Sequence, residues 1–286
     1  MKFAATLVDN ENRGVFITPL SEDARNSSDI FIGLYEEESD TACGVMALDA
    51  VTDESEKAVA LSVREVIIDE AYKCPEAERE FFSFLQEIAM AAGCSAIFSS
   101  EYIPEGDEEE RIAFYENLGF YEEEKRLPLY EFAFSDVNAK KPVTGMGCLD
   151  LSALSKDQWE AFVVDASEYS FEVMDRDYYD SKTSVFLVDD ERRLQAGLLT
   201  SIRDGALFIE GIAAYGSDES ALISDLVCWG SSAAEKSHKK DENIYMYMFS
   251  NRIHANLLKE VTGGKARKIG NLVNFTYEVP VTFVKE

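Results

Sequence analysis

The side chains that most often carry metal or nucleophilic chemistry are scarce in this sequence. It contains two histidines, His238 and His254, and five cysteines, with no Cys-x-x-Cys spacing and no Cys/His cluster. A zinc site needs about four Cys, His or acidic ligands at a characteristic spacing, and an odd number of cysteines does not indicate a disulfide framework. We therefore expect no metal centre, no Ser-His-Asp or Cys-His catalytic group, and reduced, mostly buried thiols. The cysteines are Cys43, Cys74, Cys94, Cys148 and Cys228.

Carboxylates dominate the ionisable groups. The chain has 55 Asp and Glu against 27 Lys and Arg, a net charge of −28. Residues 1–136 contain 10 basic against 32 acidic residues, a net charge of −22, and residues 137–286 contain 17 against 23, a net charge of −6. Such a field repels nucleic acid and anionic membranes, so we expect neither as a partner. A highly soluble acidic surface accounts for the charge, and a cationic substrate or partner is the alternative.

The sequence shows no sign of a membrane span or a secretion signal. No apolar run approaches the roughly 18 residues that cross a bilayer. The N-terminal run reaches Asp9 too early for a signal peptide and is more typical of a first β-strand. We expect a cytoplasmic protein.

The length of 286 residues suits two domains of ordinary size. A polar stretch with a Lys pair and a proline, residues 135–142, has the composition of a linker. We predict domains at 1–136 and 143–286. Both halves show the same order of elements: three strands, a helix, a strand, a helix and two strands.

The element ranges follow from hydrophobic periodicity and from turn residues. In the first half, Gly93 and Gly119 are expected to end helices, and Asp107 is expected to cap the second helix in a capping box with Glu110. The predicted strands of this half are 30–35, 44–51, 59–68, 95–99, 120–124 and 129–134, and its helices are 76–92 and 107–118. The predicted strands of the second half are 147–151, 185–188, 196–202, 206–213, 243–249, 266–269 and 272–279. Its predicted helices are 157–169, 219–236 and 251–261.

The segment from Arg111 to Phe120, Arg-Ile-Ala-Phe-Tyr-Glu-Asn-Leu-Gly-Phe, resembles a motif of the GNAT superfamily of N-acetyltransferases. In that family a helix with a Phe-Tyr pair leads through a Gly-Phe pair into a strand. The resemblance covers about residues 30–134 and, through element order alone, 147–280. It implies an α/β (α+β) fold of two tandem GNAT-like domains, each with a mixed, mostly antiparallel twisted sheet flanked by helices.

The resemblance also implies acetyl-CoA as a cofactor, bound where two adjacent parallel strands splay apart. In this chain those strands are 59–68 with 95–99, and 206–213 with 243–249. The pyrophosphate would lie at the start of the following helix, where backbone N–H groups face the ligand. The residues then implied to bind the cofactor are Val66, Ile68, Lys73, Ile212, Gly216, Ser217, Ser220 and Ala221.

The phosphate-binding loop departs from the family pattern in both halves. In the first, Glu76 and Glu78 stand at positions that are small in the family, and Pro75 removes a backbone donor. The glutamates suit the start of a helix but repel a phosphate.

In the second half Ala221 keeps a small side chain, whereas Asp218 and Glu219 oppose a phosphate. The milder charge favours this half if only one of the two binds CoA.

The resemblance implies three catalytic candidates. Tyr115 matches the tyrosine that protonates the departing CoA thiolate, and Glu65 and Glu210 occupy strand positions where the family places a general base. A packed aromatic residue and two solvated strand residues are the alternatives. The second half lacks an equivalent tyrosine.

A basic cluster formed by Lys259, Lys265, Arg267 and Lys268 could pair with the acidic first half or receive an anionic ligand.

Two functions follow from these observations. One is transfer of an acetyl group from acetyl-CoA to a primary amine, on a cationic small molecule or a lysine-bearing protein. The other is a catalytically inactive GNAT-fold protein that acts as a binding or regulatory module. The sequence does not determine the acceptor or the oligomeric state.

Overall fold

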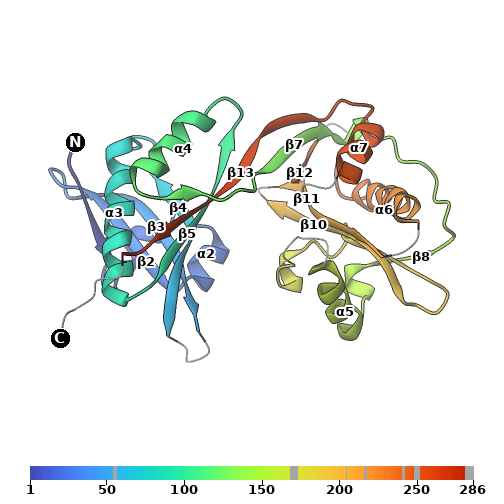
Figure 1. The fold of residues 1–286 in the computed structure, drawn as a ribbon, viewed down its shortest axis with the longest axis horizontal. Helices are drawn as coiled ribbons and strands as arrows, with labels where there is room; N and C mark the ends of the chain where they lie inside the picture. The colour runs from blue at the N-terminus through green and yellow to red at the C-terminus, as the bar shows by residue number, and fades with distance from the viewer. Residues whose placement is uncertain are drawn as a thin grey trace. The chain divides into compact units, whose positions relative to one another are not determined.

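The computed structural model describes residues 1–53, 57–167, 173–203, 205–215, 218–239, 242–247 and 252–280. The chain forms two compact units (Figure 1). Unit 1 comprises Met1–Arg126 and Leu272–Glu286, and unit 2 comprises Leu127–Asn271. None of the helices in the described ranges is both long and apolar enough to cross a lipid bilayer.

Unit 1 is a mixed sheet with helices packed on it. Its strands follow the spatial order β1-β2-β3-β4-β5-β13, and β6 pairs with β13. The β4–β5 pair is parallel, and the β1–β2, β2–β3 and β3–β4 pairs are antiparallel. Its strands are β1 (Phe3–Leu7), β2 (Ile30–Glu36), β3 (Thr41–Thr52), β4 (Ala58–Ile68), β5 (Ala96–Pro104), β6 (Tyr121–Glu122) and the end of β13 (Arg267–Glu278). Its helices are α1 (Arg13–Phe16), α2 (Glu22–Ser27), α3 (Pro75–Ala92) and α4 (Glu108–Asn117).

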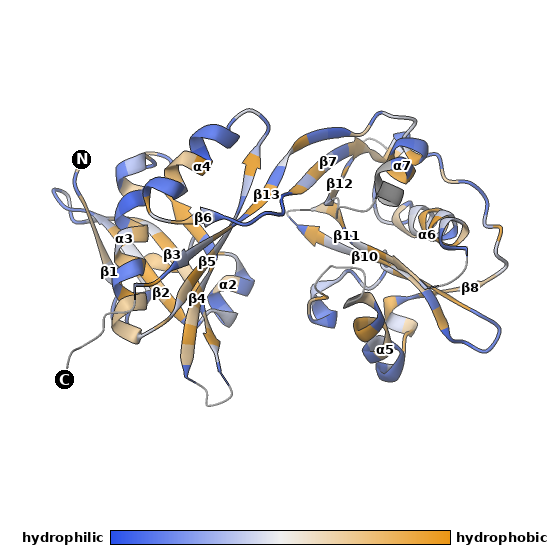
Figure 2. Cartoon of the chain, in the orientation of Figure 1, coloured by the Kyte–Doolittle hydropathy of each residue, from blue (hydrophilic) through white to orange (hydrophobic). Residues whose placement is uncertain are grey.

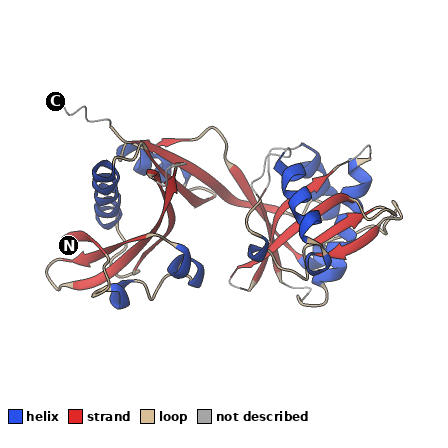
Figure 3. Cartoon of the chain, turned by 90° about the horizontal axis from the view of Figure 1, so that it is seen from below, coloured by secondary structure: helices blue, strands red, loops and turns tan. Residues whose placement is uncertain are grey.

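Unit 2 repeats this plan. Its strands follow the order β7-β12-β11-β10-β9-β8, with β11 and β12 parallel. Its strands are β7 (Leu127–Ala133), β8 (Gly147–Asp150), β9 (Val185–Val188), β10 (Leu194–Arg203), β11 (Ala206–Ala214) and β12 (Asn243–Tyr247). Its helices are α5 (Lys156–Ser167), α6 (Glu219–Ala234) and α7 (Arg252–Val261), with short 3-10 turns at Phe134–Asp136, Leu151–Ala153 and Arg176–Tyr178. In both units the strands are flanked by helices (Figure 3).

Apolar residues that recur at helical spacing in the sequence are buried in the cores of the two units. The long helix of unit 1, α3, buries Phe81, Phe82 and Leu85 against the sheet. In Figure 2, hydrophobic residues lie along the strands of both units, and the helices carry both hydrophobic and hydrophilic residues. Gly93 ends α3 in the left-handed conformation at φ 73°, and Gly119 follows α4 at φ 85°, as the sequence predicts.

The units are not the contiguous halves 1–136 and 143–286 that the sequence suggests. Strand β7 lies next to β12 in unit 2, where Phe132 enters the core. The end of β13 completes unit 1 instead, where Val273 and Phe275 are almost fully buried. The strands predicted at 266–269 and 272–279 are therefore one continuous strand, which begins in unit 2 and ends in unit 1.

One local prediction is wrong. Asp107 stands at the N-cap of α4, but its side chain makes no capping hydrogen bond to any residue in the described ranges. The helix begins with Glu108, Glu109 and Glu110, whose charges already favour its N-terminus.

Candidate functional site

A cleft opens in unit 1 where β4 and β5 stop pairing. The two strands run in parallel register from Ala60↔Ala96 to Val63↔Ser99, and both continue beyond these residues without pairing to each other. A cavity of ≈ 790 Å³ lies between them, walled also by the first turns of α3 and α4. Its volume falls within the range of small-molecule sites, about 300–1,000 Å³.

A β-bulge in β4 contributes to this divergence. Ala47 pairs with Glu65 and Leu48 with Val63, so Arg64 is the additional residue on β4. Bulges bend a strand and redirect its side chains. Unit 2 has the same feature, because Leu199 pairs with Gly211 and Thr200 with Ile209, which leaves Glu210 as the additional residue on β11.

The charged lining of the cleft is mostly acidic. Six carboxylates and three basic side chains border it. The carboxylates are Glu65, Glu70, Glu78, Glu101, Asp107 and Glu110, and the basic side chains are Arg64, Lys73 and Arg111.

Arg111 forms the central ion pair of the cleft. Its guanidinium donates to Glu78 on α3 at 2.7 Å and to Glu101 on β5 at 2.8 Å. The three side chains are only 15–27% exposed. Burial alone would lower the pKa of Arg111, but the hydrogen bonds and charges of Glu101 and Glu78 outweigh it and raise the pKa. Arg111 therefore stays charged and fixed at the start of α3.

Tyr115 is packed into the wall of the cleft. Its ring stacks on Phe275 with centroids 3.9 Å apart and meets the edges of Phe82 and Phe120. Its hydroxyl lies 3.4 Å from the Ser99 hydroxyl, and the residue is 3% exposed. Burial, followed by the charge of Glu101, raises its pKa. The phenol is thus a protonated donor at neutral pH.

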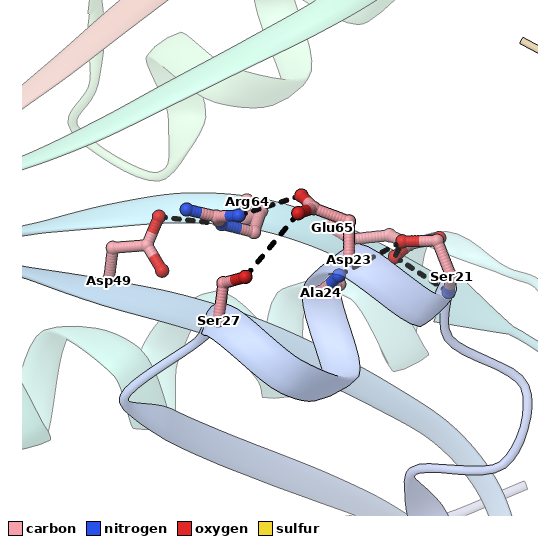
Figure 4. A network of polar contacts seen from close by, with 7 residues as sticks. All are labelled: Ser21, Asp23, Ala24, Ser27, Asp49, Arg64 and Glu65. Atoms are coloured by element: carbon pink, nitrogen blue, oxygen red, sulfur yellow. Dashed lines mark hydrogen bonds and ion pairs between the residues drawn. The ribbon is translucent and has the colours of Figure 1, made fainter. Parts of the chain in front are cut away.

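Glu65 is engaged in a structural contact. Its carboxylate accepts hydrogen bonds from the backbone N–H of Ser21 at 3.1 Å and from the Ser21 hydroxyl at 2.8 Å, at the N-cap of α2 (Figure 4). Beside it, Arg64 donates to Asp49 at 2.7 Å and to Asp23 at 2.8 Å. The predicted base therefore holds α2 against β4, and a substrate amine would have to compete with the Ser21 donors.

The other predicted residues of unit 1 line the same cleft. Val66 and Ile68 are on its β4 wall, and Lys73 lies at its rim, 58% exposed and 3.9 Å from Glu70. At the start of α3, hydrogen bonds from its own backbone N–H and from Cys74 lower the pKa of Glu76. The charged form of Glu76 is thus favoured at the helix terminus that would face a phosphate.

Those predicted residues of unit 2 that the structure describes border two different pockets. Ile212 is buried beside an apolar void of ≈ 60 Å³, whereas Ser220 and Ala221 border a separate groove of ≈ 420 Å³. Gly216 and Ser217 lie outside the described residues. Asp218 caps α6 by accepting from the Ala221 N–H at 3.2 Å. A carboxylate of the chain therefore uses a donor of this helix start.

Glu210, the predicted base of unit 2, is neutralised by an arginine. It accepts from Arg203 at 2.6 Å and also from Ser201 and Tyr178, and its side chain is 12% exposed. A substrate amine would have to compete with these three donors for the Glu210 carboxylate.

The basic cluster pairs partly within unit 2. Lys265 contacts Asp136 at 2.6 Å and Arg267 contacts Glu131 at 2.7 Å. Both acidic partners come from the first half of the sequence, as one of the two alternatives predicts, but they belong to unit 2.

Sequence reasoning missed Glu101, Arg111, Arg203 and Phe275. Arg111 could have been found, because it stands four residues before Tyr115 and therefore on the same face of α4. Phe275 could not, because no local pattern shows that β13 returns to unit 1.

Comparisons with known proteins identify the fold. No model of a protein family matches the sequence, and no curated protein matches it. A solved tandem GNAT protein from the clavulanic acid biosynthesis pathway is similar over 98% of this chain and 100% of its own, with a TM-score of 0.70 and 10% identity. A GCN5-related N-acetyltransferase from Sphaerobacter thermophilus is similar over 98% and 96%, with a TM-score of 0.60 and 11% identity.

A third solved structure contains a GCN5-related glucosamine N-acetyltransferase region of a fungal β-N-acetylglucosaminidase. It matches 96% of this chain and 38% of its own, with a TM-score of 0.65 and 9% identity. At such identities the likeness concerns the fold and not the chemistry. The chain has the GNAT fold in tandem.

Proposed function

We propose that this protein is a GNAT-fold binding protein whose unit 1 cleft takes a cationic amine, and that neither unit holds acetyl-CoA at its phosphate loop. The observation that supports this most is the Glu78–Arg111–Glu101 ion pair. It places two carboxylates of the chain around Arg111, next to the helix start where the resemblance puts the pyrophosphate.

The repulsion between a carboxylate and a phosphate is larger than the attraction that a helix terminus offers, which favours exclusion of the phosphate. One carboxylate about 4 Å from a phosphate charge costs about 4 kcal/mol at an effective dielectric constant of 20. The helix terminus offers an anion only about 0.3–1 kcal/mol. Glu78 also competes directly for Arg111, a half-buried cation that contacts the first turn of α3. In unit 2, Asp218 occupies the Ala221 donor in the same way.

The same lining favours a cation. After Arg111 is paired, the cleft keeps more carboxylates than basic groups, among them Asp107 and Glu110 near the start of α4. Its wall also includes the aromatic rings of Phe82 and Tyr102. An ammonium group gains from both, by ion pairing and by contact with aromatic faces.

N-acetyl transfer to a primary amine is the second candidate. The protonated Tyr115 hydroxyl at the cleft wall supports it, because a general acid must lie within reach of the leaving thiolate. The cofactor would then have to enter despite Glu78, and Glu65 would have to release Ser21 to act as a base.

Calorimetric titration of the full chain separates the two candidates. Spermidine serves as the probe amine and acetyl-CoA as the probe cofactor, at about 0.15 M salt, which limits non-specific attraction to the acidic surface. We expect saturable spermidine binding, no acetyl-CoA binding, and no release of free CoA thiol when both are present.

Two matched variants test the location of the site. Glu101→Gln changes the cleft, and Glu160→Gln changes an exposed residue of α5 by the same unit of charge. The first should weaken spermidine binding about tenfold or more, and the second should leave it unchanged. Equal effects would place the amine outside the cleft. Tight acetyl-CoA binding with thiol release would establish the acetyltransferase instead.

A further inference from the structure

A second cation-binding arrangement lies in unit 2, on the face of its sheet opposite α6. The guanidinium of Arg203 lies over the ring of Phe208, 4.7 Å from the centroid, and near the rings of Tyr178 and Tyr247, at 5.7 and 5.9 Å. It also donates to the Glu210 carboxylate at 2.6 Å and to the Tyr178 hydroxyl. We call Tyr178, Phe208, Glu210 and Tyr247 the aromatic cage.

The cage supplies the contacts that a guanidinium group seeks. Aromatic faces attract a cation through their quadrupole, and the planar guanidinium stacks on them. A carboxylate adds charge-assisted hydrogen bonds. Ser201 donates to the same carboxylate, so Glu210 is held in place by a group other than Arg203.

The positions of Phe208, Glu210 and Tyr247 are fixed by the sheet, whereas Tyr178 ends the 3-10 turn Arg176–Tyr178. Phe208 pairs with Ser201 and with Tyr245, so their side chains share one face, and Tyr247 lies two residues further along β12. Glu210 is the bulged residue of β11, which accounts for its reach to Ser201 and Arg203. Phe208 is braced by stacking on Tyr245 at 4.9 Å. The walls formed by Phe208, Glu210 and Tyr247 therefore do not depend on Arg203 for their backbone positions.

Arg203, by contrast, lies at the end of β10, next to the hairpin turn that contains Gly205 at φ 79°. Its side chain is 39% exposed, whereas that of Glu210 is 12% exposed. Solvent thus reaches the arginine while the carboxylate beneath it is covered. A residue at a strand end can move out of the cage without breaking the β10–β11 pairing from Ala196 to Ile202.

We propose that the aromatic cage is a binding site for a guanidinium group, occupied by Arg203 as an internal ligand, and that an arginine side chain of a ligand or partner can replace it. The site is separate from the unit 1 cleft and does not depend on its function. With an internal ligand, the apparent affinity for an external ligand equals the affinity of the empty site multiplied by the fraction of time that the site is empty. If Arg203 occupies the cage for about nine tenths of the time, an external guanidinium binds about tenfold more weakly than to the empty cage.

Ethylguanidinium is the probe, and ethylurea is its uncharged control of similar shape. Both are titrated into the full chain and into Arg203→Ala, with binding followed by calorimetry at millimolar concentrations. We expect Arg203→Ala to bind ethylguanidinium saturably, at least about tenfold more tightly than the wild-type chain. Ethylurea should not bind, because it lacks the charge that the rings and Glu210 recognise.

Control variants identify the cage as the site. Arg193→Ala removes an exposed arginine that is paired with Asp189 and should behave like the wild type. Adding Glu210→Gln to Arg203→Ala should abolish binding. If Arg203→Ala does not fold by circular dichroism, Arg203→Gln takes its place. A folded variant that binds no ethylguanidinium, or binds it no better than the wild type, would overturn the proposal.

Discussion

Replacing Glu78 by glutamine tests the ion pair of the unit 1 cleft. Glu78→Gln keeps the size of the side chain but removes its charge, and Arg111 retains Glu101 at 2.8 Å. The variant therefore loses one charged hydrogen bond, worth about 1.5–3 kcal/mol, rather than the 3–5 kcal/mol or so that follows when a buried charge is left unpaired. We expect the free energy of unfolding to fall by about 2 kcal/mol.

The same change should open the helix start to anions. Without the Glu78 charge, Arg111 is balanced by a single carboxylate and its neighbourhood becomes more positive. We expect the affinity for CoA to rise at least about tenfold, equivalent to about 1.4 kcal/mol. Urea unfolding followed by circular dichroism measures the first effect, and calorimetric titration with CoA measures the second.

Glu87→Gln is the matched control. Glu87 is an exposed residue of the same helix, α3, and the change in charge is identical. This variant should alter neither stability by more than about 0.5 kcal/mol nor CoA binding. If Glu78→Gln behaves like Glu87→Gln in both assays, the reasoning about the ion pair is refuted.

Three further perturbations probe side-chain packing and hydrogen bonding within the two units. Because the pKa of Tyr115 is raised, its neutral form is favoured in the folded state. This stabilisation is complete below the unfolded pKa near 10 and declines by about 1.4 kcal/mol per pH unit above it, so urea titrations at pH 9–11 should show a steeper loss for the wild type than for Tyr115→Phe. Gly197→Ala should destabilise by about 1–3 kcal/mol, measured by urea unfolding, because its new Cβ would lie 2.4 Å from the Phe162 ring. Asp225→Asn should lose about 1–3 kcal/mol, because the 1% exposed carboxylate accepts from the Thr144 N–H at 2.9 Å and from the Thr144 hydroxyl, and hydrogen exchange at Thr144 should become faster.

A different outcome would contradict each of these three predictions. Parallel alkaline loss in the wild type and Tyr115→Phe would show that Tyr115 ionises freely. Gly14→Ala, where the added Cβ meets nothing within 4 Å, is the control for Gly197→Ala, and equal effects would contradict the close contact. Unchanged exchange at Thr144 in Asp225→Asn would mean that Asp225 does not hold that segment.

The sequence determined the elements and the fold that they form. Hydrophobic spacing along α3 and the glycines after α3 and α4 set local conformations, which depend on neighbours a few residues away. The Phe-Tyr and Gly-Phe pairs of residues 114–120 then indicated the GNAT fold. The comparisons with solved structures confirm that fold in its tandem form.

Only the tertiary structure decided which strands complete which unit. Strands β7 and β13 are both seven residues or longer and carry apolar side chains, so either could close either sheet. Their assignment depends on burial of Phe132 in one core and Phe275 in the other, contacts between residues far apart in the chain. The availability of the carboxylates was also decided only by the tertiary structure. A sequence shows that Glu65, Glu78 and Glu210 can accept protons or cations, but their availability depends on partners that folding brings from other elements: Ser21, Arg111 and Arg203.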